Sequence, residues 1–142
     1  MTARVRRDEV AVGTELPEQV SRVTRADLVR YAGASGDFNV IHWNERVARE
    51  VGLPGVIAHG MLTAGLAARA VTAWAGDPAA VQDYQVRFSR PVVVPDDEDG
   101  AEVTVRGRVA ALLDDGRVRV DLNVTSGGEK VLSLARAVVA LS

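Results

Sequence analysis

The chain has 142 residues, of which 47% are hydrophobic and 25% are charged, and its formal net charge is −2. This length and balance predict one globular domain spanning residues 1–142. The small net charge argues against nucleic acid as a main partner, and the absence of cysteine excludes disulfides, thiolate catalysis and cysteine-based zinc sites. The polar N-terminus and the lack of a long uninterrupted apolar run predict no signal peptide and no membrane span, so we expect a cytoplasmic protein.

Two short helices are predicted in the first part of the chain. Thr24 precedes Asp27 by three positions, an arrangement that resembles a capping box although Glu or Gln is the usual third-position residue. It predicts a helix from Arg25 to about Ala34. A second helix is expected from Asn44 to Val51, because a glycine and then a proline follow it.

The longest helix is predicted at about Gly60–Ala75, where apolar residues occur nearly all round and indicate burial on most sides. After it, apolar and polar residues alternate over 103–109 and 118–125, and a less regular apolar run occupies 131–141. This period of two predicts antiparallel strands, with turn signals at Asp115-Gly116 and Gly127-Gly128. A sheet with one buried helix is an α+β architecture.

The segment from Asp37 to His42 holds a carboxylate, an amide and an imidazole within six residues. Their spacing fits neither a helical stripe nor a strand alternation, so we expect a loop that fixes polar groups. Asp and His together make a general acid/base pair, because His titrates near neutral pH and a carboxylate orients it. The alternative is purely structural, an Asp-x-Asn turn that caps the following helix.

Residues 31–42, YAGASGDFNVIH, are similar to the hydratase signature of the MaoC-like family, and residues 58–63, AHGMLT, resemble the start of that family's central helix. Segments 12–17 and 84–88 extend the likeness over most of the chain, and within the family it is nearest to catalytic subunits of mycobacterial-type 3-hydroxyacyl-carrier-protein dehydratases. Val40 is a departure, because the family usually has a proline there, which would stiffen the loop.

The resemblance implies a hotdog fold, an antiparallel sheet wrapped around the helix at Gly60–Ala75. It also implies an activity, the interconversion of (R)-3-hydroxyacyl and trans-2-enoyl thioesters in fatty-acid or polyketide metabolism. Asp37 and His42 would then handle the protons. The backbone N–H of Gly60, at the start of the buried helix, would form the oxyanion hole, since helix N-termini favour anions.

Three further residues are candidates for the site. Asn39 is expected either to orient Asp37 and the water or to serve as a turn residue. His59 is expected to cap the helix and shape the pocket rather than act as a second acid/base group, and Thr63 is expected in the pocket. Asp37, His42 and His59 also have the composition of a two-His, one-carboxylate iron site, but the resemblance implies a site without metal or other cofactor.

The expected partners are an acyl-CoA or acyl-carrier-protein thioester and a second hotdog chain, in a homodimer or in a heterodimer with a paralogous subunit. No nucleic acid or membrane partner is expected. Two other functions stay open: a hotdog acyl-thioester hydrolase, and a non-catalytic subunit that only binds acyl thioesters.

Overall fold

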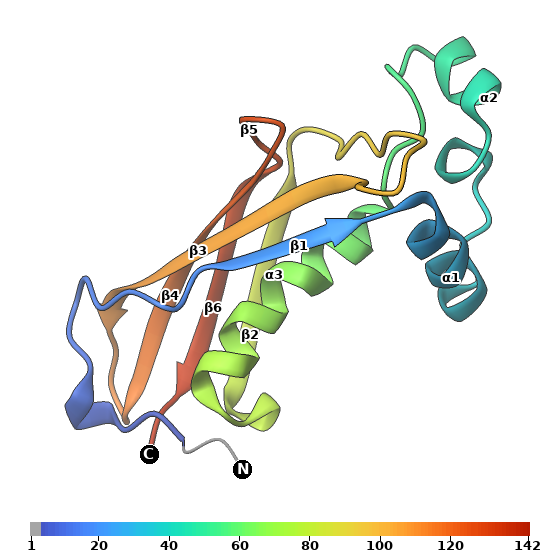
Figure 1. The fold of residues 1–142 in the computed structure, drawn as a ribbon. Coiled ribbons are helices and arrows are strands. Elements are labelled where there is room, and N and C mark those ends of the chain that lie inside the picture. The colour runs from blue at the N-terminus through green and yellow to red at the C-terminus, as the bar shows by residue number, and fades with distance from the viewer. Residues whose placement is uncertain (1–3) are drawn as a thin grey trace.

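One antiparallel sheet forms the frame of the computed structural model, which describes residues 4–142 (Figure 1). Residues 1–3, part of the polar N-terminus considered above, lie outside the described part. The strand order is β1-β3-β4-β6-β2, with the short β5 paired to β4 beside this path. The bounds are β1 Gln19–Val23, β2 Val81–Phe88, β3 Ala101–Leu112, β4 Arg117–Ser126, β5 Glu129–Lys130 and β6 Leu132–Ala140.

Residues 4–142 also contain three α-helices and three short 3-10 helices. They are η1 Arg7–Glu9, α1 Arg25–Ser35, η2 Val40–His42, α2 Glu45–Glu50, α3 Gly60–Ala75 and η3 Pro78–Ala80. The capping box that begins α1 is confirmed: the Thr24 side chain accepts from the Asp27 N–H, and the Asp27 carboxylate accepts from the Thr24 N–H at 2.8 Å. The bounds predicted for α3 are also confirmed, and Gly76 ends it in the left-handed conformation.

The long helix α3 lies along one face of the sheet (Figure 1). Its buried positions are Thr63, Ala64, Ala67, Ala70, Val71 and Ala75, mostly small residues that allow the sheet to approach closely. The Tyr84 hydroxyl of β2 donates to the Ala64 carbonyl at 2.6 Å and ties helix to sheet. This arrangement confirms the α+β hotdog architecture.

The prediction that α3 is buried on most sides is wrong for the single chain. The Met61 side chain is 64% exposed, and Gly65 and Arg69 further along the same helix are exposed as well. The sheet covers only one face of the helix, so the opposite stripe has no covering layer among the described residues. Within residues 4–142, no helix is both long and apolar enough to cross a membrane.

Helices α1 and α2 lie beyond the end of the sheet, near the N-terminal end of α3 (Figure 1). An ion-pair network connects them: the Glu45 carboxylate of α2 accepts from Arg25 at 2.5 Å and from Arg49 at 3.1 Å. Arg25 also donates to the Val94 carbonyl at 2.7 Å. The start of α1 is therefore tied to the start of α2 and to the Val94 main chain.

Candidate active site

The loop after α1 places Asp37 through local hydrogen bonds. Gly36 ends α1 at φ 78°, a left-handed conformation that suits glycine, and its N–H donates to the Ala32 carbonyl at 2.9 Å. The Asp37 N–H then donates to Ser35 Oγ at 3.2 Å, and Asp37 Oδ1 accepts from the Asn39 N–H at 3.1 Å. Within residues 4–142 the second carboxylate oxygen accepts no hydrogen bond, and the side chain is 52% exposed.

The Asn39 side chain belongs to the turn and does not reach Asp37. Its Oδ1 accepts from the Ile41 N–H at 3.3 Å and begins η2, while its backbone N–H is the group that orients Asp37. Val40 occupies the first position of η2. The N–H at this position has no partner within the helix, so either proline or valine can stand here without loss of a hydrogen bond in η2.

The His42 side chain is buried, and a main-chain carbonyl holds its ring. Its Nδ1 lies 2.8 Å from the Ile57 carbonyl oxygen. A carbonyl only accepts, so Nδ1 carries the hydrogen and Nε2 of the neutral ring carries the lone pair. That lone pair lies 4.0 Å from Asp37 Oδ2. The two atoms are too far apart for a direct hydrogen bond but close enough for both to hold one water oxygen.

His59 lies behind His42 in the core, at 1% exposure. The two imidazole rings stack with centroids 3.8 Å apart and planes 23° apart. Nε2 of His59 donates to the Asp37 carbonyl at 3.1 Å. Burial is the main cause that holds the pKa of His59 below its ordinary value, against the opposite effect of this hydrogen bond.

The helix-capping role expected for the His59 side chain is wrong. His59 is the N-cap residue of α3, but its side chain makes no capping hydrogen bond. Its Nε2 donates to the Asp37 carbonyl, and Nδ1, the ring atom that could accept from the helix, has no partner among the described residues. The Leu62 and Thr63 N–H groups donate to the His59 carbonyl, so Gly60 and Met61 carry the N–H groups of α3 that have no intrahelical partner. His59 also stands behind the cavity wall rather than on it, since its ring is covered by His42.

A cavity of about 260 Å³ brings His42 together with the N-terminus of α3. Gly60 and Thr63 of α3 line it, together with Phe88 at the end of β2 and Arg90 just after it. Gly60 lies so close to the Phe88 ring that an added Cβ would be 3.0 Å from Cε1. Sequence reasoning missed Phe88 and the Ile57 carbonyl. Phe88 lies in segment 84–88, which the family resemblance included, and this was a signal for it, but a backbone carbonyl leaves none.

Asp37, His42 and His59 offer ligand atoms that all lie within 4.8 Å of one another, and together they have the composition of a metal site. The geometry does not fit one ion. A metal lies near the plane of each imidazole that binds it, and two rings stacked nearly parallel cannot share such a point. The Nδ1 atom of His42 and the Nε2 atom of His59 are also committed to carbonyl oxygens.

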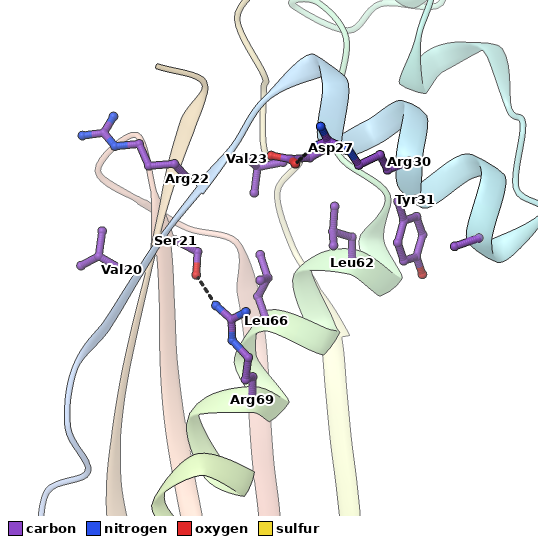
Figure 2. A pocket seen from close by; sticks show the side chains of 11 residues that line it. Val20, Ser21, Arg22, Val23, Asp27, Arg30, Tyr31, Leu62, Leu66 and Arg69 are labelled. Atoms are coloured by element: carbon purple, nitrogen blue, oxygen red, sulfur yellow. Dashed lines mark hydrogen bonds and ion pairs between the residues drawn. The ribbon is translucent and has the colours of Figure 1, made fainter. Parts of the chain in front are cut away.

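A larger cleft of about 510 Å³ lies between β1, α1 and α3 (Figure 2). Leu62 and Leu66 of α3 contribute apolar lining, and Arg69 donates to Ser21 Oγ at 3.0 Å (Figure 2). Neither Asp37 nor His42 lines this cleft. Its size therefore does not make it the reaction site; the smaller cavity, which joins His42 to the start of α3, is the candidate.

Comparisons with known proteins agree with this geometry. A family model described as "MaoC like domain" matches residues 9–126. The 3-hydroxyacyl-thioester dehydratase X of Mycobacterium tuberculosis is 48% identical over 79 residues, 56% of this chain and 27% of that protein. The 3-hydroxybutyryl-CoA dehydratase of Methylorubrum extorquens is 33% identical over 112 residues, 78% of this chain and 68% of that protein.

Solved structures show the same fold. A MaoC-like dehydratase superimposes with a TM-score of 0.94 at 44% identity, over 98% of this chain and 43% of that one. The R-hydratase PhaJ1 of Pseudomonas aeruginosa gives a TM-score of 0.82 at 28% identity, over 97% of this chain and 86% of that one. The chain thus spans less than half of two of these similar proteins and most of the others.

Proposed function

We propose a hydro-lyase activity for this chain, which belongs to the MaoC-like dehydratase family. The reaction is the reversible addition of water to a trans-2-enoyl thioester, which gives the (R)-3-hydroxyacyl thioester. The observation that carries the proposal is the 4.0 Å gap between His42 Nε2 and Asp37 Oδ2, with the start of α3 in the same cavity as His42.

In hydration, a water held between His42 and Asp37 attacks the β-carbon of the enoyl group and gives up a proton to the pair. The C2–C3 double-bond electrons move toward the thioester carbonyl, whose oxygen takes the negative charge. A proton then passes from the pair to C2, so that hydroxyl and hydrogen have been added across the double bond. Proton transfer by positioned side chains typically contributes about 10²–10⁴ in rate, and dehydration uses the same groups in reverse.

The Gly60 N–H is the proposed donor to the thioester oxygen. It has no intrahelical partner at the start of the 16-residue helix α3, and the helix dipole favours negative charge there. A donor of this kind, fixed in advance, typically contributes about 10²–10³ in rate. Thr63, one turn further along α3, is buried in the same cavity and contributes to the pocket wall.

A second hotdog chain is the proposed protein partner, either another copy or a paralogous subunit. Strand β2 is an edge strand, paired only with β6 among the described strands. Phe88 at the end of this strand and Met61 of α3 are 51% and 64% exposed, and Phe88 also lines the cavity. Exposed edges and apolar side chains of this kind mark interaction surfaces. A chain placed there would close the cavity.

The thioester carrier is proposed to be CoA or an acyl-carrier protein. Arg90 at the cavity carries a guanidinium whose nearest carboxylate among the described residues is Glu129, at 3.8 Å. This contact is long and exposed, so it leaves Arg90 available for charge-assisted bonds to a phosphate of the carrier arm.

The test is a hydration assay on the purified chain with crotonyl-CoA and with a longer trans-2-enoyl-CoA, in which loss of the enoyl absorbance and release of free thiol are followed together. The proposal predicts loss of absorbance, a 3-hydroxyacyl product of (R) configuration and no thiol. Thiol release would instead identify a thioesterase. Binding of the thioester without turnover, with the paralogous chain added, would identify a non-catalytic subunit.

A further inference from the structure

We propose that His59 is a positioning residue that holds the acid/base pair in register without touching the substrate. The inference rests on the proposed hydration function, because it explains how the Asp37 and His42 side chains are kept in place. The structure offers three independent observations: the ring contacts of His59, the direction of its hydrogen bond, and a nitrogen atom without a partner.

The first observation is that the His59 ring contacts two other rings. It stacks on His42, at 3.8 Å between centroids, and it meets Tyr31 of α1 at 4.6 Å and 60°. All of this takes place at 1% exposure of His59. The His42 ring is thus supported from behind, while the Ile57 carbonyl fixes its Nδ1–H. These two contacts leave its Nε2 lone pair one direction, toward Asp37.

The second observation is that His59 also holds the backbone of Asp37. Its Nε2 lies 3.1 Å from the Asp37 carbonyl oxygen, and since this oxygen only accepts, Nε2 must carry the hydrogen. One residue therefore contacts both members of the pair: it stacks on the ring of His42 and bonds the main chain of Asp37. The side chain of Asp37 is half exposed, so its position depends on this backbone anchor and on the Asn39 N–H.

The third observation is a buried ring nitrogen without a partner, which is expected to lower stability. With Nε2–H used on Asp37, the Nδ1 atom of His59 keeps a lone pair that is buried and has no partner among the described residues. Buried polar atoms in proteins are nearly always bonded, and an apolar side chain of similar size would avoid the cost. A core imidazole that stabilises poorly but contacts both catalytic candidates is better explained by function than by folding.

The neutral state of the His59 ring also suits this positioning role. A second proton would sit on Nδ1, where no acceptor awaits it, and burial already disfavours the charged ring. During hydration His42 gains a proton next to this ring. A neutral neighbour accommodates that positive charge, whereas a charged neighbour at stacking distance would repel it.

The experiment compares two substitutions that separate the two contacts. His59→Phe keeps a flat ring for His42 but loses the donor to Asp37, and His59→Gln keeps an N–H donor at a similar reach but loses the stack. We expect His59→Phe to unfold no more easily than the wild type and to lose about 10–100-fold in kcat with KM unchanged, since small misplacements at a reacting centre have effects of this size. His59→Gln should recover part of that loss.

The matched control is Val118→Ala, a truncation of a fully buried side chain of β4 that belongs to no part of the site. It should lower the melting temperature and leave kcat unchanged below the transition. Wild-type kcat in a folded His59→Phe variant would overturn the proposal. The proposal would also be overturned if kcat fell in step with the melting temperature in His59→Phe, His59→Gln and Val118→Ala, because His59 would then have a structural role only.

A measurement without turnover keeps this inference separate from the hydration function. Long-range ¹H–¹⁵N correlation spectra of the imidazoles report which ring nitrogen is protonated. We expect His59 as the neutral Nε2–H form and His42 as the Nδ1–H form at neutral pH. The opposite tautomer at His59 would refute the proposal even in an active enzyme. The expected tautomers in a chain that does not hydrate enoyl thioesters would refute the proposed function and leave the geometry of His59 intact.

Discussion

Replacing Gly60 with alanine tests whether the space between α3 and Phe88 is needed for the reaction. An added Cβ would lie 3.0, 3.2 and 3.3 Å from three carbons of the Phe88 ring. Carbon atoms prefer about 3.5–4.0 Å, so the ring must retreat by roughly 0.5–1 Å. Phe88 is 51% exposed, and it can turn outward at small cost. We therefore expect the free energy of unfolding to change by less than about 1 kcal/mol.

The activity should respond much more strongly, because the new methyl group and the displaced ring both border the cavity in which the thioester would lie against the Gly60 N–H. A misplacement of about 1 Å at a reacting centre can cost about 10²-fold. This corresponds to about 2.7 kcal/mol of transition-state stabilisation. We expect kcat/KM for crotonyl-CoA to fall by about that factor while the N–H itself remains.

The assay is steady-state hydration of crotonyl-CoA, with thermal unfolding measured on the same samples. Gly33→Ala is the matched control, because Gly33 lies within α1, away from the cavity, and an added Cβ there has nothing within 4 Å. It should raise stability by roughly 1 kcal/mol through helix propensity and leave kcat/KM unchanged. A folded Gly60→Ala variant with wild-type kcat/KM would refute the argument.

Three further predictions concern stability. Burial lowers the pKa of His59 from 6.5, so below about pH 6.5 the unfolded chain binds a proton at this residue more readily than the folded chain does. The free energy of unfolding should therefore fall as the pH drops below about 6.5, and it should fall less in His59→Phe. Urea titrations at pH 7 and 5.5 that give the same change in the free energy of unfolding for both proteins would contradict this. Burial raises the pKa of Tyr84 to about 12, so the free energy of unfolding should fall as the pH rises above 10. Tyr84→Phe should remove this alkaline loss of stability and cost about 1 kcal/mol at neutral pH through the lost bond to Ala64. The same alkaline loss of stability in the variant would be the contrary result. Gly100→Ala places a Cβ against the Val23 carbonyl at φ +67° and should destabilise the fold by more than about 2 kcal/mol. Gly127→Ala, at φ +59° with open space around it, should destabilise it by about 1–2 kcal/mol. Equal losses of stability for the two variants in thermal melts would argue against the clash at Gly100.

Local sequence patterns predicted the elements well, because the forces that set them are local. The cap at Thr24 and the glycine after Ala75 define where α1 begins and α3 ends. The period of two in β3 and β4 reflects one buried face, as their fully buried valines confirm. The bounds of α3 were predictable to the residue because a strong helical run there lies between a His-Gly start and a glycine stop.

The contacts within the site were not predictable in the same way. His42 and His59 are 17 positions apart, and their stacking depends on how the loop before α2 closes over the start of α3. The partner of His42 Nδ1 is a main-chain carbonyl, which any residue at position 57 would supply. Apolar residues nearly all round α3 predicted burial on most sides, but composition cannot say whether the second covering layer comes from the same chain.

The central claim is that Asp37 and His42 act together on a water molecule, and Asp37→Asn tests it most directly. The amide keeps the size of the carboxylate and its acceptor for the Asn39 N–H, so the loop should stay folded. The measurement is crotonyl-CoA hydration by wild type and variant, each with whatever second hotdog chain the wild type requires for activity, with thioester binding measured in parallel. We expect a loss of about 10²–10⁴ in kcat with binding intact. An Asp37→Asn variant that hydrates crotonyl-CoA at the wild-type rate would contradict it.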